Sequence, residues 1–181
     1  MVPAIPFHRL CWRMRAEGPV SPLSRLAEAS DLGPLQDMIR GTAVPPLGSR
    51  FSDGSFRPLY AALDQRTCLA EVVHHWSRAF LHSGCQAGSP LRTVLLSVGI
   101  HGDRFLDVRT GHAELHDPDS YEASQRFGMD TYLAGEDGII YRSVRDPEGT
   151  CVAAIRPRAA GIPEANSELR LVWTGERFEA A

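Results

Sequence analysis

The stretch GSRFSDGSFRPLY, residues 48–60, places an arginine among small residues. A guanidinium makes charge-assisted, often bidentate hydrogen bonds to phosphate oxygens. Gly48 and Ser49 carry little bulk, which would let a ligand approach the backbone beside Arg50. Most arginines are instead solvated, or paired with a surface carboxylate for little energy. Spacing alone therefore leaves two roles open for Arg50, a phosphate ligand or an ordinary surface cation.

Three further polar residues have structural interpretations when each is taken alone. Tyr60 lies in the apolar run LYAAL, which is typical of a core tyrosine. Glu71 falls about 160° from the centre of the apolar stripe of its helical segment, where a carboxylate is usually solvated. Ser143 precedes the turn-forming residues 146–149 and would cap that hairpin. Sequence geometry gives none of the three a chemical role on its own.

The elements that must position these side chains follow from periodicity and breaker residues. The clearest helix covers residues 66–84 and stops at its final glycine. A second, with Asp119 or Ser120 as its N-cap, is expected in residues 117–128, and two short helices are expected in residues 21–41. The expected strands cover residues 7–14, 92–100, 105–110, 138–145, 150–157 and 169–180, the last with a turn at 174–176. These elements favour an α+β (mixed α/β) fold with a central mixed, mostly antiparallel sheet flanked by helices.

Length and composition bound the class of protein. The 181 residues, 43% of them hydrophobic, suit a single domain covering residues 1–181. A formal net charge of −3, without basic tracts, argues against direct nucleic-acid binding. No apolar run approaches the roughly 18 residues of a membrane span, and no signal-peptide core is present. The four cysteines form no CxxC pair and are expected to be reduced, as in a soluble cytoplasmic protein.

Common catalytic motifs are missing from the sequence. There is no GxGxxG, no GxxxxGK[ST] and no GxSxG, which argues against a Rossmann site, a P-loop and a serine-hydrolase elbow. HAELH places His112 and His116 four residues apart, a spacing that suits a metal on a helix. Gly111 before this motif and Pro118 after it disfavour a helix. We expect a surface loop and no metal, and a metal-dependent hydrolase stays a minor alternative that a chelator would inactivate.

Two longer segments identify a resemblance. GSRFSDGSFRPLYAALDQRTCLAEVVHH, followed by EDGIIYRSVRDPEGTCVAAIRP, resembles the RES domain, which is named for its arginine, glutamate and serine. The resemblance covers about residues 12–157 and leaves residues 158–181 as a C-terminal strand and hairpin. RES proteins are toxins of RES–Xre toxin–antitoxin pairs, are similar to ADP-ribosyltransferases in fold, and consume NAD. The resemblance therefore implies cleavage of the bond between nicotinamide and ribose.

The family's site residues transfer one by one. Its arginine, tyrosine, glutamate and serine correspond to Arg50, Tyr60, Glu71 and Ser143. Its N-terminal arginine corresponds to Arg13 in CWRM, and the alternative is Arg9 in FHRL. Two departures stand out. The usual GGRWN is GSRFS here, which changes the loop beside the arginine, and the usual YPS is YRS, which puts a bulky cation next to the serine and could alter the acceptor or the rate.

The resemblance implies a role for each of these residues. Breaking an N-glycosidic bond leaves a ribosyl oxocarbenium ion, which a carboxylate near the 2′-hydroxyl, here Glu71, would stabilise. Arg50 and Arg13 would bind the pyrophosphate. Tyr60 would stack on the nicotinamide, and Ser143 would hydrogen-bond the nicotinamide amide or the ribose. NAD is then a consumed substrate, so no resident cofactor is expected.

Acceptor and partner follow from the same resemblance. Water as acceptor makes an NAD glycohydrolase, inorganic phosphate as co-substrate makes an NAD phosphorylase, and a protein side chain makes a mono-ADP-ribosyltransferase. The first two are favoured because no target-docking element stands out. A non-catalytic binding module on the same fold is the alternative of another class. The expected partner is an Xre-type (ParS-like) antitoxin, forming an oligomer with the chain and covering the NAD cleft, with no membrane partner.

Overall fold

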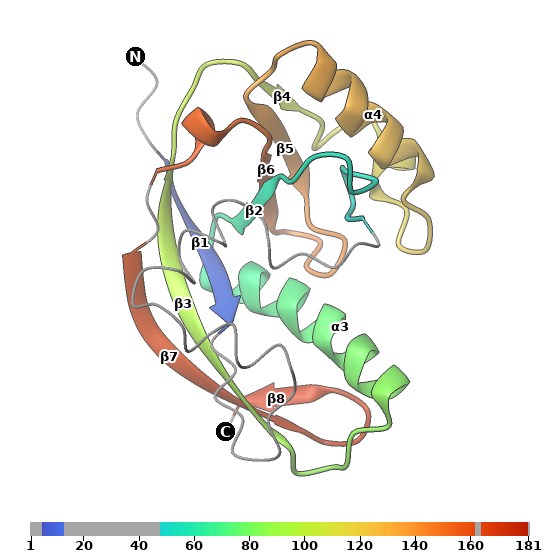
Figure 1. Ribbon diagram of the computed structural model, residues 1–181, viewed down its shortest axis with the longest axis vertical. Helices are drawn as coiled ribbons and strands as arrows, with labels where there is room; N and C mark the ends of the chain where they lie inside the picture. The colour runs from blue at the N-terminus through green and yellow to red at the C-terminus, as the bar shows by residue number, and fades with distance from the viewer. Residues whose placement is uncertain (1–4, 13–47, 162–163, 181) are drawn as a thin grey trace.

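The fold is built on a long, bent sheet crossed by one long helix (Figure 1). The computed structural model describes residues 5–12, 48–161 and 164–180. The described strands are β1 (Ile5–Trp12), β2 (Leu59–Ala62), β3 (Pro90–Ile100), β4 (Phe105–Asp107), β5 (Gly138–Arg142), β6 (Thr150–Ala154), β7 (Glu164–Trp173) and β8 (Phe178–Ala180). The described helices are α3 (Gln65–Ser83) and α4 (Glu122–Leu133), with the 3-10 helices η1 (Ala113–His116) and η2 (Pro157–Ala159).

The eight strands form one sheet in the order β4-β5-β6-β2-β1-β3-β7-β8. Neighbouring strands are antiparallel, except that β4 and β5 run parallel. A single register pair, His8 with Ala62, joins the half formed by β4, β5, β6 and β2 to the half formed by β1, β3, β7 and β8. The predicted α+β class with a mixed, mostly antiparallel sheet is confirmed.

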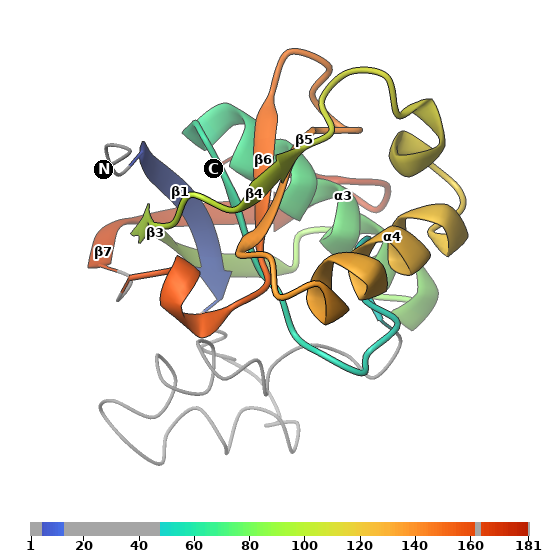
Figure 2. The same cartoon turned by 90° about the horizontal axis from the view of Figure 1, so that it is seen from above.

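Helix α3 contacts both halves of the sheet, and α4 covers one end. The long helix packs on β1, β2, β6 and β8, whereas α4 packs on β5 and η1. In Figure 2 the second helix lies beyond β5, away from β1 and β3. The hairpin between β5 and β6 lies against the face of α3 opposite its apolar stripe. No described helix is long and apolar enough to cross a membrane.

The ends of α3 match the sequence prediction. Asp64 is the N-cap and accepts a hydrogen bond from the Thr67 backbone N–H at 2.9 Å. Gly84 is the C-cap, in the left-handed conformation with φ 63°, which glycine adopts without steric cost. The apolar stripe of the helix, represented by Trp76 and Phe80, packs against Trp173 and its neighbours on β7 and β8. Tertiary packing of this stripe fixes which face of the helix points away from the sheet.

The start of α4 differs from the prediction. Neither Asp119 nor Ser120 is its N-cap, because the helix begins at Glu122 after an uncapped Tyr121. The carboxylate of Asp117 instead accepts the backbone N–H groups of residues 119 and 120, so the polar residues stabilise the preceding loop. The helix also continues past the glycine at position 128 to Leu133.

Every strand expected from the sequence overlaps an observed strand within the described residues, and the turn before β8 forms with Thr174 bonded to Arg177. The hairpin between β5 and β6 also forms, closed by hydrogen bonds from Ser143 N–H to the Gly149 carbonyl and from Gly149 N–H to the Asp146 carbonyl. Strand β2 was not predicted, because its four residues are too short to show alternation. The two short helices expected in residues 21–41 lie outside the described residues.

Candidate active site

Arg50 is held on a tight turn formed by residues 49–52. Ser49 and Ser52 bond to each other through their backbones, N to O at 2.6 Å and 3.3 Å. Gly48, which precedes the turn, has φ 78°, and a Cβ at this position would press on the Ser52 carbonyl at 2.8 Å. The small residues around Arg50 are therefore needed to form the turn that carries it. This structural role is separate from any space that they leave for a ligand.

The guanidinium of Arg50 contacts only neutral groups among the described residues. Its Nη1 donates to the carbonyl oxygens of Leu115 at 3.1 Å and Asp117 at 3.0 Å, and the Tyr121 ring lies beneath it at 4.6 Å. The residue is only 9% exposed. Within the described part of the chain no carboxylate lies within ion-pair distance of it, although buried cations are normally paired. Such a cation is prepared to receive an anion.

Tyr60 on β2 is tied to the Arg50 turn. Its hydroxyl lies 2.8 Å from Ser49 Oγ and accepts the Phe51 backbone N–H at 2.9 Å. Burial raises the pKa of this phenol to about 12, so it stays neutral and can act as donor and acceptor at once. The tyrosine therefore helps to fix the turn, and its ring is only partly buried.

Helix α4 supports the turn from behind. Gln125 donates from Nε2 to the Ser49 carbonyl at 3.0 Å. One turn further along, Gly128 lies so close to Phe51 that a Cβ there would overlap the Phe51 carbonyl. The glycine inside the helix is what lets α4 approach the backbone next to Arg50. Its helix-weakening effect is compensated by this contact.

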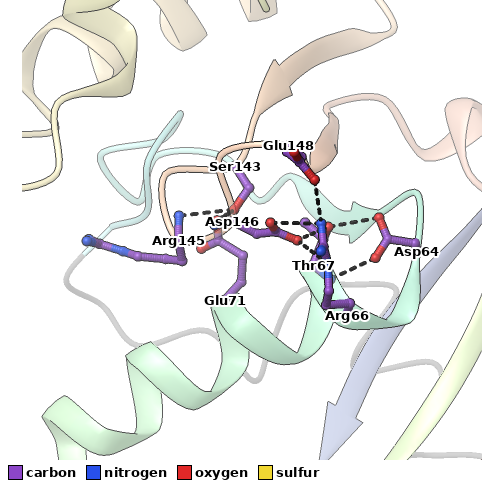
Figure 3. Close-up of polar contacts among 8 residues, drawn as sticks. All are labelled: Asp64, Arg66, Thr67, Glu71, Ser143, Arg145, Asp146 and Glu148. Carbon is purple, nitrogen blue, oxygen red and sulfur yellow. Dashed lines mark hydrogen bonds and ion pairs between the residues drawn. The ribbon is translucent and has the colours of Figure 1, made fainter.

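Glu71 on α3 meets Ser143 at the end of β5 (Figure 3). The serine hydroxyl donates to Glu71 Oε1 at 2.6 Å, although the two residues are 72 positions apart. The other carboxylate oxygen lies 3.9 Å from His75 Nε2, and the Glu71 side chain is 25% exposed. It is therefore not the plainly solvated helix carboxylate that helix geometry alone suggested. The face of α3 opposite the apolar stripe packs against the hairpin.

The hydroxyl oxygen of Ser143 also organises its own loop. It accepts the backbone N–H groups of Arg145 at 3.1 Å and Asp146 at 2.9 Å, and the serine is 2% exposed. Ser143 thus caps the hairpin, as the sequence suggested, and binds Glu71 with the same side chain. The two N–H donors occupy the lone pairs of the Ser143 oxygen and fix its position, so the hydroxyl proton points at the Glu71 carboxylate.

A polar clamp joins this hairpin to the first turn of α3, and we define it as Asp64, Arg66, Thr67 and Asp146 (Figure 3). The buried Thr67 hydroxyl lies 2.8 Å from one oxygen of each aspartate, and Arg66 Nε lies 3.1 Å from Asp146. A Cβ on Gly149 would overlap the threonine side chain, so the hairpin backbone lies directly on the helix. The clamp fixes the distance between the elements that carry Glu71 and Ser143.

Tyr141 lies between the two groups of residues and was missed by the sequence analysis. Its ring packs edge-on against Phe51 at 4.9 Å. Burial raises the pKa of its phenol well above the ordinary value, with smaller contributions from Cys151 and Glu71 and an opposing one from Arg50. Its inward position follows from the pleat of β5, where residues 139, 141 and 143 are buried and residue 142 is exposed.

The same alternation bears on the departure from the family's YPS. Arg142 is exposed and lies between the buried Tyr141 and Ser143, so its side chain leaves the opposite side of the strand. The bulky cation is therefore next to Ser143 in sequence but not beside its hydroxyl. The choice between Arg13 and Arg9 is open, because Arg13 lies outside the described residues and Arg9 is described only through its backbone pairing with Leu96.

The HAELH motif forms a short 3-10 helix, η1, and not an α-helix. His116 Nε2 accepts the Arg142 backbone N–H at 3.2 Å, so its Nδ1 carries the proton and donates to the His112 carbonyl at 2.8 Å. His112 lies 3.5 Å from Glu114. Among the described residues, no group of three or more His, Cys, Asp or Glu side chains is placed to hold a metal ion.

The site therefore combines a carboxylate held by a serine with a buried arginine that lacks an acidic partner in the described structure, a combination suited to an anionic substrate. The RES domain family model matches residues 22–174, so the chain belongs to the RES domain family. This confirms the resemblance drawn from the motifs.

A solved structure supports the same fold. The crystal structure of the M. tuberculosis MbcT–MbcA toxin–antitoxin complex contains a chain that matches with a TM-score of 0.54 and 14% identity, over 95% of this chain and 87% of that one. Identity this low shows similarity of fold alone. No curated protein matches the chain.

Proposed function

We propose that the chain is the toxin of a toxin–antitoxin pair and that it degrades NAD by cleaving the bond between nicotinamide and ribose. The observation that carries the proposal is the 2.6 Å hydrogen bond from Ser143 to Glu71, which joins two of the family's namesake residues. Membership of the RES family supports the chemistry, and the similar fold found in a toxin–antitoxin complex supports the biological setting. The three namesake residues of the family come from distant parts of the chain.

The carboxylate supplies the main chemical effect. Departure of nicotinamide leaves positive charge on the ribose ring, and an ionised carboxylate near the 2′-hydroxyl stabilises that charge as it develops. Glu71 has one oxygen bonded to Ser143 and a partly exposed side chain, so its second oxygen remains available to the sugar. The serine holds the carboxylate in one rotamer. Its hydroxyl would also hydrogen-bond the nicotinamide amide or the ribose when the substrate is bound.

The arginine and tyrosine bind the rest of the dinucleotide. Among the described residues, Arg50 donates to carbonyl oxygens through Nη1, and the other N–H groups of its guanidinium would bind the pyrophosphate. The family's N-terminal arginine, Arg13, would contribute a second cation. Tyr60 would offer its ring face to the nicotinamide while its hydroxyl stays bonded to the turn.

The acceptor of the ADP-ribosyl group is water or inorganic phosphate in this proposal. A mono-ADP-ribosyltransferase acting on a cellular protein is the alternative, and all three reactions release nicotinamide. The proposed partner is an Xre-type antitoxin that covers the site in an oligomer with the chain. Expression without the antitoxin should lower cellular NAD and stop growth.

The test is to incubate the purified, antitoxin-free chain with NAD, with and without phosphate, and to quantify nicotinamide and ribosyl products. Glu71→Gln keeps the size of the side chain and should lower nicotinamide release about 100-fold or more. Glu122→Gln, on the exposed face of α4, is the matched control and should act like the parent chain. Absence of nicotinamide release in both buffers would overturn the enzymatic proposal and favour a binding module. The second product identifies the acceptor.

A further inference from the structure

A second arginine approaches the loop that holds Arg50. Arg145 Nη2 donates to the Pro118 carbonyl at 3.0 Å, and Arg50 Nη1 donates to the Asp117 carbonyl at 3.0 Å. The acceptors are consecutive carbonyls, whose Cα atoms are about 3.8 Å apart in any chain. Two guanidinium groups from segments 95 positions apart along the chain (145 minus 50) are therefore bound to one short stretch of backbone.

Neither guanidinium has an acidic partner within the described residues. Six other described arginines do pair with carboxylates: Arg66, Arg104, Arg109, Arg126, Arg158 and Arg177. The carboxylate of Asp117, in the loop that both arginines contact, accepts the backbone N–H groups of residues 119 and 120 at 2.8 Å and 3.0 Å. These bonds lower its pKa, with a smaller contribution from Arg50, and occupy the carboxylate in its own loop.

Both cations also act on the same helix. Burial lowers the pKa of His74 and of His75, and the charges of Arg145 and Arg50 lower both further, whereas the charge of Glu71 raises the pKa of His75. The charges of both arginines are thus felt at the same stretch of α3. Like charges held close together repel, and an anion between them would relieve the repulsion.

We propose that Arg145 is a second phosphate-binding arginine, which together with Arg50 holds a phosphate group beside the loop of residues 115–118. This rests on the proposed function, in which that group is the diphosphate of NAD. The Arg145 backbone N–H donates to Ser143 Oγ at 3.1 Å, so the loop that binds the phosphate also positions the serine next to Glu71. Figure 3 shows the Arg145 side chain extending away from the clamp. A free phosphate acting as acceptor has the same chemistry and is a separate arm of the test.

The experiment compares Arg145→Gln, Arg145→Lys and Arg142→Gln in the full chain. The neighbouring Arg142 is exposed and leaves the other side of the strand, which makes it the matched control. Calorimetry measures the Kd for ADP-ribose, which carries the diphosphate, and kinetics measures the KM for NAD and for inorganic phosphate. Arg145→Gln should weaken ADP-ribose binding about tenfold or more, because a charge-assisted bond is lost. Arg145→Lys should recover part of the affinity, and Arg142→Gln should change nothing.

The outcomes separate this inference from the proposed function. An Arg145→Gln chain that binds ADP-ribose and phosphate as the parent does would overturn the inference, even if the parent releases nicotinamide. A raised KM for phosphate with unchanged ADP-ribose binding would support the phosphate site and assign it to the acceptor. Arg145-dependent binding of ADP-ribose without nicotinamide release would support the site while the proposed reaction fails. A parent chain that binds neither ligand would overturn the inference.

Discussion

Ser143 donates its hydroxyl proton to Glu71 Oε1 over 2.6 Å while its oxygen accepts two backbone N–H groups from its own hairpin. One side chain therefore closes a turn and holds a carboxylate on a distant helix. The prediction that this serine caps its hairpin is confirmed, and the same hydroxyl also holds Glu71, because a hydroxyl is a donor and an acceptor at once. A change at this position should consequently affect stability and activity together.

Ser143→Ala should do both. Removing the hydroxyl leaves the buried loop N–H groups without their acceptor, at a cost of about 1–3 kcal/mol in the free energy of unfolding. It also frees Glu71, so the kcat for nicotinamide release should fall about tenfold or more. Urea unfolding and initial rates measure the two effects. Ser124→Ala removes an equally buried hydroxyl, bonded to the Tyr121 carbonyl on α4, and should lower stability alone. Unchanged kcat in Ser143→Ala would contradict the assignment.

Arg50→Gln should raise the KM for NAD more than it lowers kcat. The glutamine can still donate to a carbonyl, but it cannot supply a charge-assisted bond to phosphate, which contributes about 1.5–3 kcal/mol. The expected loss in kcat/KM is therefore about 10- to 100-fold. Arg126→Gln, whose cation is 70% exposed and paired with Glu122, is the control. Equal KM values for Arg50→Gln and the parent would show that Arg50 is structural.

The motif order singled out Arg50, Glu71 and Ser143 as candidate site residues, while local pattern alone did not predict that Glu71 and Ser143 meet. The apolar stripe correctly indicated helix α3 and its stop at Gly84. The same apolar stripe suggested that Glu71 faces water, because Glu71 lies on the opposite face of the helix. The stripe identifies only the face that packs on the sheet and gives no information about what covers the other face. The hairpin that covers the other face lies about seventy residues later, and contacts between segments so far apart leave no local periodicity.

Two other features depended on three-dimensional context for the same reason. The N-cap of α4 was predicted wrongly because the carboxylate of Asp117 accepts the backbone N–H groups of Asp119 and Ser120, which keeps both residues in the loop before the helix. Arg145 was seen only as part of a motif, because the lack of an acidic partner is a property of its surroundings and not of its neighbours in sequence. Tyr141 was missed as well, because the consecutive apolar residues Ile139, Ile140 and Tyr141 show no alternation in the sequence.

Thr67→Val should loosen the clamp without changing its volume much. The buried hydroxyl lies between Asp64 and Asp146 and donates to one of their carboxylate oxygens at a time, so its loss leaves that oxygen without its donor and should cost about 1–3 kcal/mol. Nicotinamide release should fall with kcat affected more than KM, because the clamp positions Glu71 against the hairpin and does not bind substrate. Arg66→Gln, whose side chain is 68% exposed, should cost well under 1 kcal/mol. Equal effects from the two changes would argue against a positioning role.

His74 should make stability depend on pH in the mildly acidic range. Burial lowers its pKa from 6.5 to about 4, and nearby arginine charges add to the effect. Within the described residues its Nε2 has no hydrogen-bond partner. The unfolded chain takes up a proton at higher pH than the folded one, so this contribution to stability is present above pH 6.5 and is lost as the pH falls towards 4. Urea midpoints at pH 7 and pH 4.5 should differ less in His74→Gln than in the parent, whereas His82→Gln should match the parent.

Gly128→Ala should displace the Arg50 turn from a distance. The added methyl group would overlap the Phe51 carbonyl. The overlapped atoms belong to the backbone of a tight turn, so no flexible side chain can move aside to make room. Alanine favours an isolated helix by up to about 1 kcal/mol, so a gain in stability is the expectation from propensity alone. Overpacking should outweigh it by about 1–3 kcal/mol and raise the KM for NAD, because the turn carries Arg50. Arg126→Ala on the exposed face of the same helix is the control, and greater stability of Gly128→Ala with unchanged KM would show that α4 does not position the arginine.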